Sequence, residues 1–431
     1  MPKTPIRIHW FRNDLRVHDN EALSAGDDVP IAPLFILDPR RLDDHRLGFP
    51  LLGPHRLRFL TQSLHGLRAS LRDRGSDLIV RVGAAEDVFT DLARQFDIRS
   101  ITMPAQHTWY EKVETARVER AIGVAPCGFH TTSLVHPDDV PFEIAKTPFI
   151  FTQFRKRIEK AKAWRPPVPE PTTLPGLPPD LRSADWPDTW PQLPDTDVDE
   201  RTAIPFEGGE AAGLARLEDY VSSDRVARYK FTRNQLVGAD YSTKFSLWLA
   251  DGSLSARTVR ERIARYERDV QRNKSTYWVV FELLWRDFFK YQAMRYGRRF
   301  FHKAGLRRTD RAYTGSRAAF DRWRRGETGD DFVDANMIEL DRTGFMSNRG
   351  RQNAASYLVH DLGVDWRWGA YWFQNRLIDF DVHSNWGNWM YVAGVGNDPR
   401  TDRTFDTRWQ AQKYDARRIF RDRWLDSVGS A

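Results

Sequence analysis

Cysteine, long apolar runs and a secretory leader are scarce or missing in this chain of 431 residues. The single cysteine, Cys127, excludes an intramolecular disulfide and a cysteine-based metal site, and it suits a reducing compartment. A mean hydropathy of -0.61, with no apolar run of about 18 residues, argues against a membrane span. The opening residues, MPKTPIRIHWF, lack the apolar segment of a signal peptide. We therefore expect no metal site, no membrane partner and a cytoplasmic protein, or an organellar or nuclear one in a eukaryote.

Tryptophan and basic residues are in excess instead. The chain has 16 tryptophans, and 11 of them follow residue 240. The formal charge is +7 and the pI is about 9.4, which permits a polyanionic partner without requiring one. A chain of this length is too long for one ordinary core, so two domains are expected.

The first 135 residues alternate β-rich runs with helical runs. Buried strands are predicted at residues 6–11, 29–37, 77–82, 98–104 and 128–135. Helical spacing fills residues 53–75 and 84–97, and Gly75 stands where a C-terminal cap belongs. This rhythm predicts an α/β domain, residues 1–135, around a parallel five-stranded, Rossmann-like sheet. No G-x-G-x-x-G follows the first strand, so a dinucleotide at that turn is not expected.

Proline marks the middle of the chain. Ten prolines fall within residues 166–194, a density that neither a helix nor a central strand tolerates. We therefore predict a long interdomain connector at residues 136–206. The following segment, residues 207–431, shows no convincing strand and is predicted to be an all-helical domain, with amphipathic helices at residues 208–221, 255–270, 275–297, 353–363 and 366–378.

A glutamate stands between two tryptophans in the segment STYWVVFELLWRDFFKY. On a helix, Trp278, Glu282 and Trp285 would share one face, because they are four and three residues apart. An ionised carboxylate is costly in that setting unless a cation pairs with it. Two interpretations stay open. Glu282 belongs either to an aromatic core, bonded to an arginine such as Arg286, or to a pocket wall that stacks a flat ligand and hydrogen-bonds it.

Two other segments carry polar groups suited to a ligand. The run YSTKFS, residues 241–246, precedes a short helical run and could offer hydroxyls, backbone N–H groups and Lys244 to a phosphate, although an ordinary helix cap is the commoner use. In residues 343–400, Asp379 and Asp381 could address one ligand, although Asp-x-Asp is usually a solvated turn. The segment NWGNWMY, residues 385–391, is also interpreted as a turn, with tryptophans that could simply be core. The co-occurrence of these groups indicates more than packing.

Several motifs together resemble the photolyase/cryptochrome family. The stretch HWFRNDLRVHDNEAL is similar to that family's opening strand and turn, and the combination of ELLWRDFF, FMSNRGRQNAAS and LIDFDVHSNWGNW is highly specific. Three further segments resemble the cryptochrome-DASH branch: FTQFRKRIE, VGADYSTKFS and SNRGRQN. The resemblance covers nearly the whole chain. It implies an α/β domain, a long connector and a helical domain that binds FAD.

The resemblance also implies a set of cofactor ligands. The FAD phosphates would be held by Tyr229, Ser242, Thr243, Lys244, Phe245 and Ser246. Asp379 and Asp381 would face the flavin and ribitol, and Asn385 would lie at flavin N5. Glu282, Arg286 and Asn348 complete the implied set.

For the substrate, the resemblance implies a cyclobutane pyrimidine dimer in DNA. Glu282 and Asn348 would contact its bases, Trp285 would stack on it, and Arg349 and Arg351 would lie near the backbone of the lesion strand. Met346 and Ser347 stand where enzymes for the (6-4) photoproduct carry a histidine pair, so that chemistry is disfavoured. Tyr391 stands where photolyases acting on duplexes typically carry a second tryptophan, which implies a preference for single-stranded DNA. One lost aromatic plate weakens the grip on a base by about 1–3 kcal/mol.

The sequence matches the family pattern less regularly at the electron-transfer chain and at the antenna site. Trp389 would be the tryptophan next to the flavin and Trp366 the middle one. The outer position aligns with Tyr313, so either Tyr313 or a neighbour such as Trp323 would serve as the exit. An antenna of 5,10-methenyltetrahydrofolate is implied, with Glu111 or Glu114 as its acidic ligand.

Three functions follow from different classes. The first is a deoxyribodipyrimidine photo-lyase that repairs dimers in single-stranded DNA. The second is a blue-light receptor with little repair, and the third is a basic nucleic-acid-binding protein without catalysis. The joint presence of Glu282, Asn348 and Trp285 favours repair, because a sensor needs no lesion-binding set. We expect a monomer that binds single-stranded DNA carrying pyrimidine dimers, with RNA or duplex DNA as non-specific partners.

Overall fold

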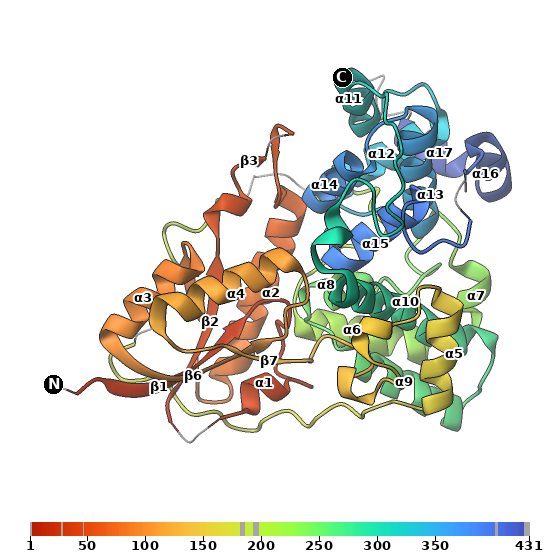
Figure 1. Ribbon diagram of the computed structural model, residues 1–431. Coiled ribbons are helices and arrows are strands. Elements are labelled where there is room, and N and C mark those ends of the chain that lie inside the picture. The colour runs from red at the N-terminus through yellow and green to blue at the C-terminus, as the bar shows by residue number, and fades with distance from the viewer. Residues whose placement is uncertain are drawn as a thin grey trace.

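The computed structural model describes residues 2–26, 29–45, 47–181, 186–192, 198–400 and 404–425. An α/β domain at one side joins a helical domain at the other (Figure 1). The α/β domain holds a parallel five-stranded sheet in the order β5-β2-β1-β6-β7. Its strands are β1 (Thr4–Phe11), β2 (Ile31–Leu37), β5 (Ile79–Val82), β6 (Phe96–Pro104) and β7 (Cys127–Phe129). The predicted parallel five-stranded sheet is therefore confirmed.

Helices cover both faces of this sheet. The helix α2 (Pro54–Arg72) packs Leu57, Leu64 and Leu67 against one face, and α3 (Ala85–Gln95) and α4 (Trp109–Ile122) cover the other. The remaining elements of this domain are α1 (Glu21–Ser24) and the two-stranded β3 (Asp44–His45) and β4 (Phe49–Pro50). Gly75 has φ of 87°, as expected just beyond the end of a helix.

The fifth strand is shorter than the predicted 128–135. Only Cys127–Phe129 pairs with β6, and the chain then turns toward the helical domain. There the backbone N–H groups of Leu134 and Val135 donate to the buried carboxylate of Asp287, at 3.1 and 2.8 Å. Residues 134 and 135 are buried for this reason and not because they belong to the sheet, which is a distinction that hydrophobicity alone does not make.

The described part of the connector holds the helix α5 (Phe151–Ala161), which packs Phe154 and Ile158 into the helical domain, and two short 3-10 turns at Pro137–Asp139 and Ile144–Lys146. From residue 162 to 206, the described part has no helix or strand, and its first stretch follows the lower edge of the molecule in Figure 1. Parts of the proline-rich stretch 166–194 lie outside the described residues, as do residues 426–431 of the predicted second domain.

The described residues after 207 form helices and no strand, as predicted. The helices are α6 (Glu210–Ser222), α7 (Tyr229–Thr232), α8 (Ser246–Asp251), α9 (Ala256–Asp269), α10 (Lys274–Tyr296), α11 (Arg317–Arg325), α12 (Asp331–Thr343), α13 (Asn348–Ser356), α14 (Trp366–Arg376), α15 (Val382–Val392), α16 (Thr407–Tyr414) and α17 (Ile419–Leu425). Among the helices of these described ranges, none is long and apolar enough to span a bilayer.

The segment NWGNWMY is helical, so its interpretation as a turn is wrong. It lies in α15, whose first turn is capped by the side chain of Asp381, which accepts from the N–H of Ser384 at 2.8 Å. Gly387 lets α15 approach α10, because a Cβ there would lie 2.2 Å from Cδ1 of Phe289. The glycine and asparagines that suggested a turn are thus used for close packing and for side-chain bonds within a helix.

Buried charges join the two domains. Arg257 on α9 pairs with Asp19, which is fully buried, and with Glu21. Arg16 donates to the carbonyl oxygens of Gly252 and Thr131 at 2.7 Å each. These bonds hold the end of β1 against the helical domain, and they fix the position of the sheet relative to it.

Candidate functional site

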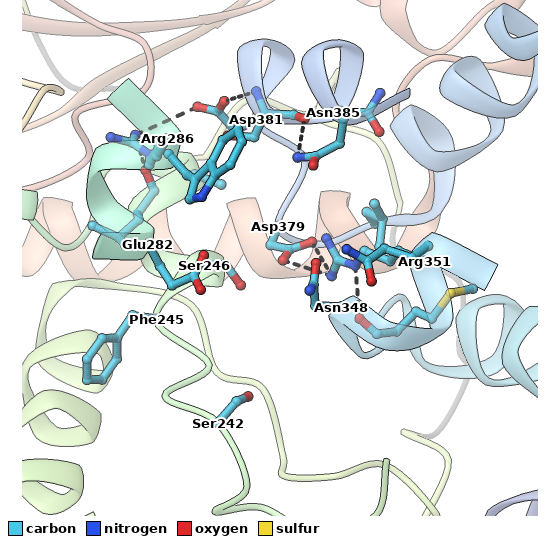
Figure 2. Close-up of a pocket in the computed structure, with 18 of the residues that line it drawn as sticks. Ser242, Phe245, Ser246, Glu282, Arg286, Asn348, Arg351, Asp379, Asp381 and Asn385 are labelled. Atoms are coloured by element: carbon cyan, nitrogen blue, oxygen red, sulfur yellow. Dashed lines mark hydrogen bonds and ion pairs between the residues drawn. The ribbon is translucent and has the colours of Figure 1, made fainter. Parts of the chain in front are cut away.

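A cavity of about 450 Å³ lies inside the helical domain, between α8, α10, α13 and α15. Figure 2 shows side chains from these separate helices converging on it. The cavity is lined by every residue expected to bind the cofactor: Tyr229, Ser242, Thr243, Lys244, Phe245, Ser246, Glu282, Arg286, Asn348, Asp379, Asp381 and Asn385. Trp285, Arg351, Trp389 and Tyr391 line it as well. Residues that are up to 162 positions apart in sequence therefore meet at one site.

Two carboxylates on one side of the cavity are held by different cations. Asp379 forms a two-pronged ion pair with Arg351, at 2.9 and 3.0 Å (Figure 2). Arg286 lies 3.7 Å from Asp381 and also donates to the carbonyl oxygen of Leu249 at 2.7 Å. Arg351 was expected near a lesion strand, but its guanidinium orients Asp379 in the cavity wall. Such charge-assisted bonds fix side chains for a polar ligand.

Asp381 is ionised at neutral pH. Burial alone would raise the pKa of its carboxyl group, but the His383 ring, whose Nδ1 lies 3.7 Å from the carboxylate, and the charges of Arg286 and Lys290 hold that pKa well below its usual range. Asn385 also lines the cavity, and its side-chain amide donates to the carbonyl oxygen of Ala370 at 3.0 Å. This side of the site presents fixed acceptors to a ligand.

The opposite side carries a buried cation. Lys244 is 2% exposed, and its Nζ lies 3.3 Å from the ring centre of Tyr241 and 4.5 Å from that of Phe345. Among the described residues its ammonium group has no hydrogen-bond partner. Burial lowers the pKa of Lys244 well below its usual value, although Glu339 partly opposes this. An unpartnered buried ammonium group next to the hydroxyls of Ser242 and Thr243 fits a phosphate-bearing ligand.

Glu282 is paired with Arg233 and not with Arg286, the example considered from the sequence. Trp278 does share the helix face with Glu282, and the guanidinium of Arg233 lies 5.2 Å from its ring centre. Burial raises the pKa of Glu282 above its ordinary value, and Arg233 only partly reverses this. Arg233 was missed because it lies 49 residues from Glu282 and no local pattern links the two.

Two aromatic rings meet edge to face at the cavity mouth. Trp285 and Tyr391 have ring centres 5.8 Å apart and planes at 89°. Phe151 from the connector stacks on Trp285 at 3.7 Å, so one face of the indole is already covered. Asn348 begins α13, is exposed and lines the same cavity. Arg349 lies outside the cavity lining and donates to Oδ1 of Asn234 at 3.1 Å.

The residues expected to carry electrons are packed in the aromatic core. Trp389 lies 5.0 Å from Phe373 and 6.1 Å from Trp323, ring centre to ring centre. Trp366 contacts Trp386 at 5.4 Å. Tyr313 lies near two cations, with Lys303 Nζ 5.2 Å and the Arg311 guanidinium 5.7 Å from its ring centre. Burial raises the pKa of its phenol group.

The two candidate antenna ligands lie away from this cavity. Glu111 closes a capping box with Thr108 at the start of α4, and Glu114 pairs with Arg12. Both carboxylates therefore already have structural roles in the α/β domain. The folate stays a prediction.

The comparisons with known proteins agree with this arrangement. Residues 7–172 match the family model for DNA photolyase, and residues 278–430 match the model for the FAD binding domain of DNA photolyase. Cryptochrome DASH from Gloeobacter violaceus is 47% identical, over 99% of this chain and 86% of the relative. The chain belongs to the photolyase/cryptochrome family.

Solved structures of the family extend the agreement to the fold. The Synechocystis sp. PCC6803 cryptochrome matches with a TM-score of 0.94 at 43% identity, over 100% of this chain and 90% of that one. A bacterial class III photolyase from Agrobacterium tumefaciens matches with a TM-score of 0.82 at 26% identity, over 100% of this chain and 88% of that one. The helical domain is thus the family's FAD-binding domain, and the predicted FAD cofactor is confirmed at that level.

Proposed function

We propose that this protein is a light-driven lyase that splits cyclobutane pyrimidine dimers, preferentially in single-stranded DNA. The observation that carries the proposal is the meeting of two residue sets in one cavity. Asp379, Asp381 and Lys244 suit a flavin dinucleotide, and Trp285 and Glu282 suit two linked pyrimidines of one strand that have left the base stack. A pure sensor or a simple binding protein has no use for the second set.

The first set binds and orients the cofactor. Lys244 would neutralise the phosphates, while Asp381 and Asn385 would hold the polar edge of the flavin ring. Asp379, fixed by Arg351, would bond the ribitol. FAD bound here in its reduced form would supply, on excitation by light, the electron that opens the dimer. Trp389 lines the same cavity and would deliver reducing electrons, with Trp366 and either Tyr313 or Trp323 behind it.

The second set recognises the lesion. Burial raises the pKa of Glu282 above its ordinary value. In its protonated form, this carboxyl group would donate a hydrogen bond to a base carbonyl and stabilise negative charge there. Trp285 offers one stacking plate, and Tyr391 stands perpendicular to it. Flipping a damaged base out of a duplex costs a few kcal/mol. A site with only one large plate therefore suits a strand that is already single.

Two further features belong to the proposal. A 5,10-methenyltetrahydrofolate antenna would bind at the α/β domain near Glu111 or Glu114, with one of their present bonds replaced. The protein would act as a monomer on single-stranded DNA, with RNA and duplex DNA bound less specifically through the basic surface.

The substitution Trp285→Ala tests the proposal at its stacking plate. We expect the variant to keep its bound flavin, because Trp285 lies at the mouth beside Tyr391, and to bind a single-stranded thymine-dimer oligonucleotide roughly 5- to 150-fold more weakly, the equivalent of 1–3 kcal/mol. Flavin content follows from the absorption spectrum and affinity from a titration in the dark. Unchanged dimer affinity with full flavin would exclude this cavity as the lesion site and favour the blue-light receptor.

A further inference from the structure

Outside the cavity, cations and aromatic rings alternate along α16 and the start of α13. We call Arg349, Tyr414, Lys413 and Trp409 the α16 strip. The guanidinium of Arg349 lies 4.7 Å from the ring centre of Tyr414. Lys413 Nζ lies 5.5 Å from the same ring and 4.5 Å from that of Trp409. Each member therefore contacts the next, so the strip is continuous.

The strip begins at the mouth of the cavity. Asn348, which lines the cavity, is followed directly by Arg349, and Phe405 lines the cavity just before α16 begins. Arg349 also bonds Asn234, the neighbour of the Arg233 that pairs with Glu282. In Figure 1 the helices α13 and α16 lie on the same side of the helical domain. A strand leaving the cavity over α13 would meet these side chains in order.

Trp409 is exposed without a packing reason. Half of its surface, 50%, is accessible, whereas Trp366, Trp386 and Trp389 are at most 2% exposed. The acidic groups of α16 are engaged within the chain: Asp406 accepts from the N–H of Trp409 at 3.0 Å, and Asp415 pairs with Arg421 at 3.0 Å. The strip therefore presents cations and rings to solvent while its nearby carboxylates are bonded internally.

This alternation fits a single nucleic-acid strand. Bases stack on exposed rings whatever their sequence, and the phosphates between them pair with cations. A base in a duplex has no free face for such a ring, so the strip also discriminates between strand forms. A protein partner would not need this repeat of ring and cation.

We propose that Trp409 stacks a base of the single DNA strand flanking the lesion, with Lys413 and Arg349 on the neighbouring phosphates. The proposal rests on the proposed function, because it needs the lesion to enter the cavity beside Asn348. It adds a determinant for single strands that lies outside the lesion pocket. The strip would extend the bound length of DNA past the dimer itself.

Two DNA ligands of different length distinguish binding at the α16 strip from binding in the cavity. The flavin-loaded protein is titrated in the dark with a fluorescent thymine-dimer dinucleotide, and with a single-stranded ten-nucleotide strand that carries the same dimer. We expect Trp409→Ala to weaken binding of the long strand roughly 5- to 100-fold and to leave the dinucleotide unchanged. Trp409→Phe keeps a ring and should bind nearly as the parent does.

Trp109→Ala is the matched control. Trp109 is 42% exposed and lies 4.2 Å under the guanidinium of Arg298, but it belongs to the α/β domain. The Trp109→Ala substitution should change neither the affinity for the dinucleotide nor the affinity for the ten-nucleotide strand. For Lys413→Gln we expect the dependence of log affinity on log salt concentration to become shallower by about 1, as for one lost phosphate contact. Thermal unfolding checks that each variant is folded.

Equal long-strand affinity of Trp409→Ala and the parent would overturn the proposal, as would the same loss in Trp109→Ala. Tighter binding of an RNA strand of the same sequence would assign the strip to RNA and also overturn it. These outcomes leave the proposed function standing if the dinucleotide still binds more tightly than an undamaged one. If neither dimer substrate is preferred over undamaged DNA, the proposed function itself fails.

Discussion

At the scale of single residues, the cavity is built on buried charges whose protonation is shifted. Glu339 faces Lys244 behind the cofactor site, and burial raises the pKa of its carboxyl group to about 8, although Lys244 and Arg351 act in the opposite sense. Lys244 in turn is held below its usual pKa by burial. Burial thus disfavours the charged form of each group, and an anionic ligand beside Lys244 would favour its ammonium form.

Glu339→Gln should change the pH dependence of stability. The folded carboxyl holds its proton up to about pH 8, whereas the unfolded one loses it near its ordinary value of 4.5. Unfolding therefore releases a proton in this window, and the parent protein loses stability as pH rises through it. We expect the flavin-free variant to gain roughly 3–4 kcal/mol relative to the parent between pH 5 and pH 8, from about 1.4 kcal/mol per unit of pKa shift. Parallel stability curves for the two proteins in urea titrations from pH 5 to pH 8 would contradict this.

At the scale of elements, the contact between α10 and α15 decides the shape of the cavity. These helices supply Glu282, Trp285 and Arg286 from one side and Asn385 and Trp389 from the other. They can approach because Gly387 presents no side chain to Phe289. A methyl group placed between them would have to move the phenyl ring or the whole helix, since interiors are close-packed.

Gly387→Ala should therefore lower the free energy of unfolding by about 1–3 kcal/mol, the usual cost of overpacking. The new Cβ would lie 2.2 Å from Cδ1 of Phe289. Gly66→Ala in α2 is the control: its Cβ would meet only Gly209 Cα at 3.8 Å, and Gly66 is exposed. That change should be neutral or stabilising by up to about 1 kcal/mol. Equal midpoints for the two variants in thermal unfolding would argue against close contact of these helices.

At the scale of the whole molecule, the parallel sheet and the helical domain can be predicted from hydrophobic periodicity. The contacts between them cannot be predicted in this way. The parallel sheet and the helical second domain were predictable, because strand and helix periods differ along the chain. The end of the fifth strand was not, since the bonds of Asp287 to residues 134 and 135 replace sheet pairing. The helix at 385–391 was also missed, because its glycine serves packing against Phe289.

The proposed cofactor residues were predicted from motifs, whereas the side chains that pair with them could be identified only in the fold. Arg233 and Glu282 are distant in sequence and meet across α7 and α10. Arg351 turns inward to Asp379, although its sequence neighbour Arg349 bonds Asn234 on the side of the α16 strip. Tertiary packing decides which face of α13 each arginine occupies, and no local sequence pattern predicts it.

The central claim is that light drives dimer splitting in this one cavity. The most direct measurement is the release of intact thymines from a dimer-containing oligonucleotide by the parent protein with its flavin reduced, compared in light and in darkness. We predict splitting that requires light and is faster on a single strand than on the matching duplex, because Trp285 faces Tyr391 and not a second large plate. No splitting of either substrate in light, with reduced flavin bound, would contradict the account.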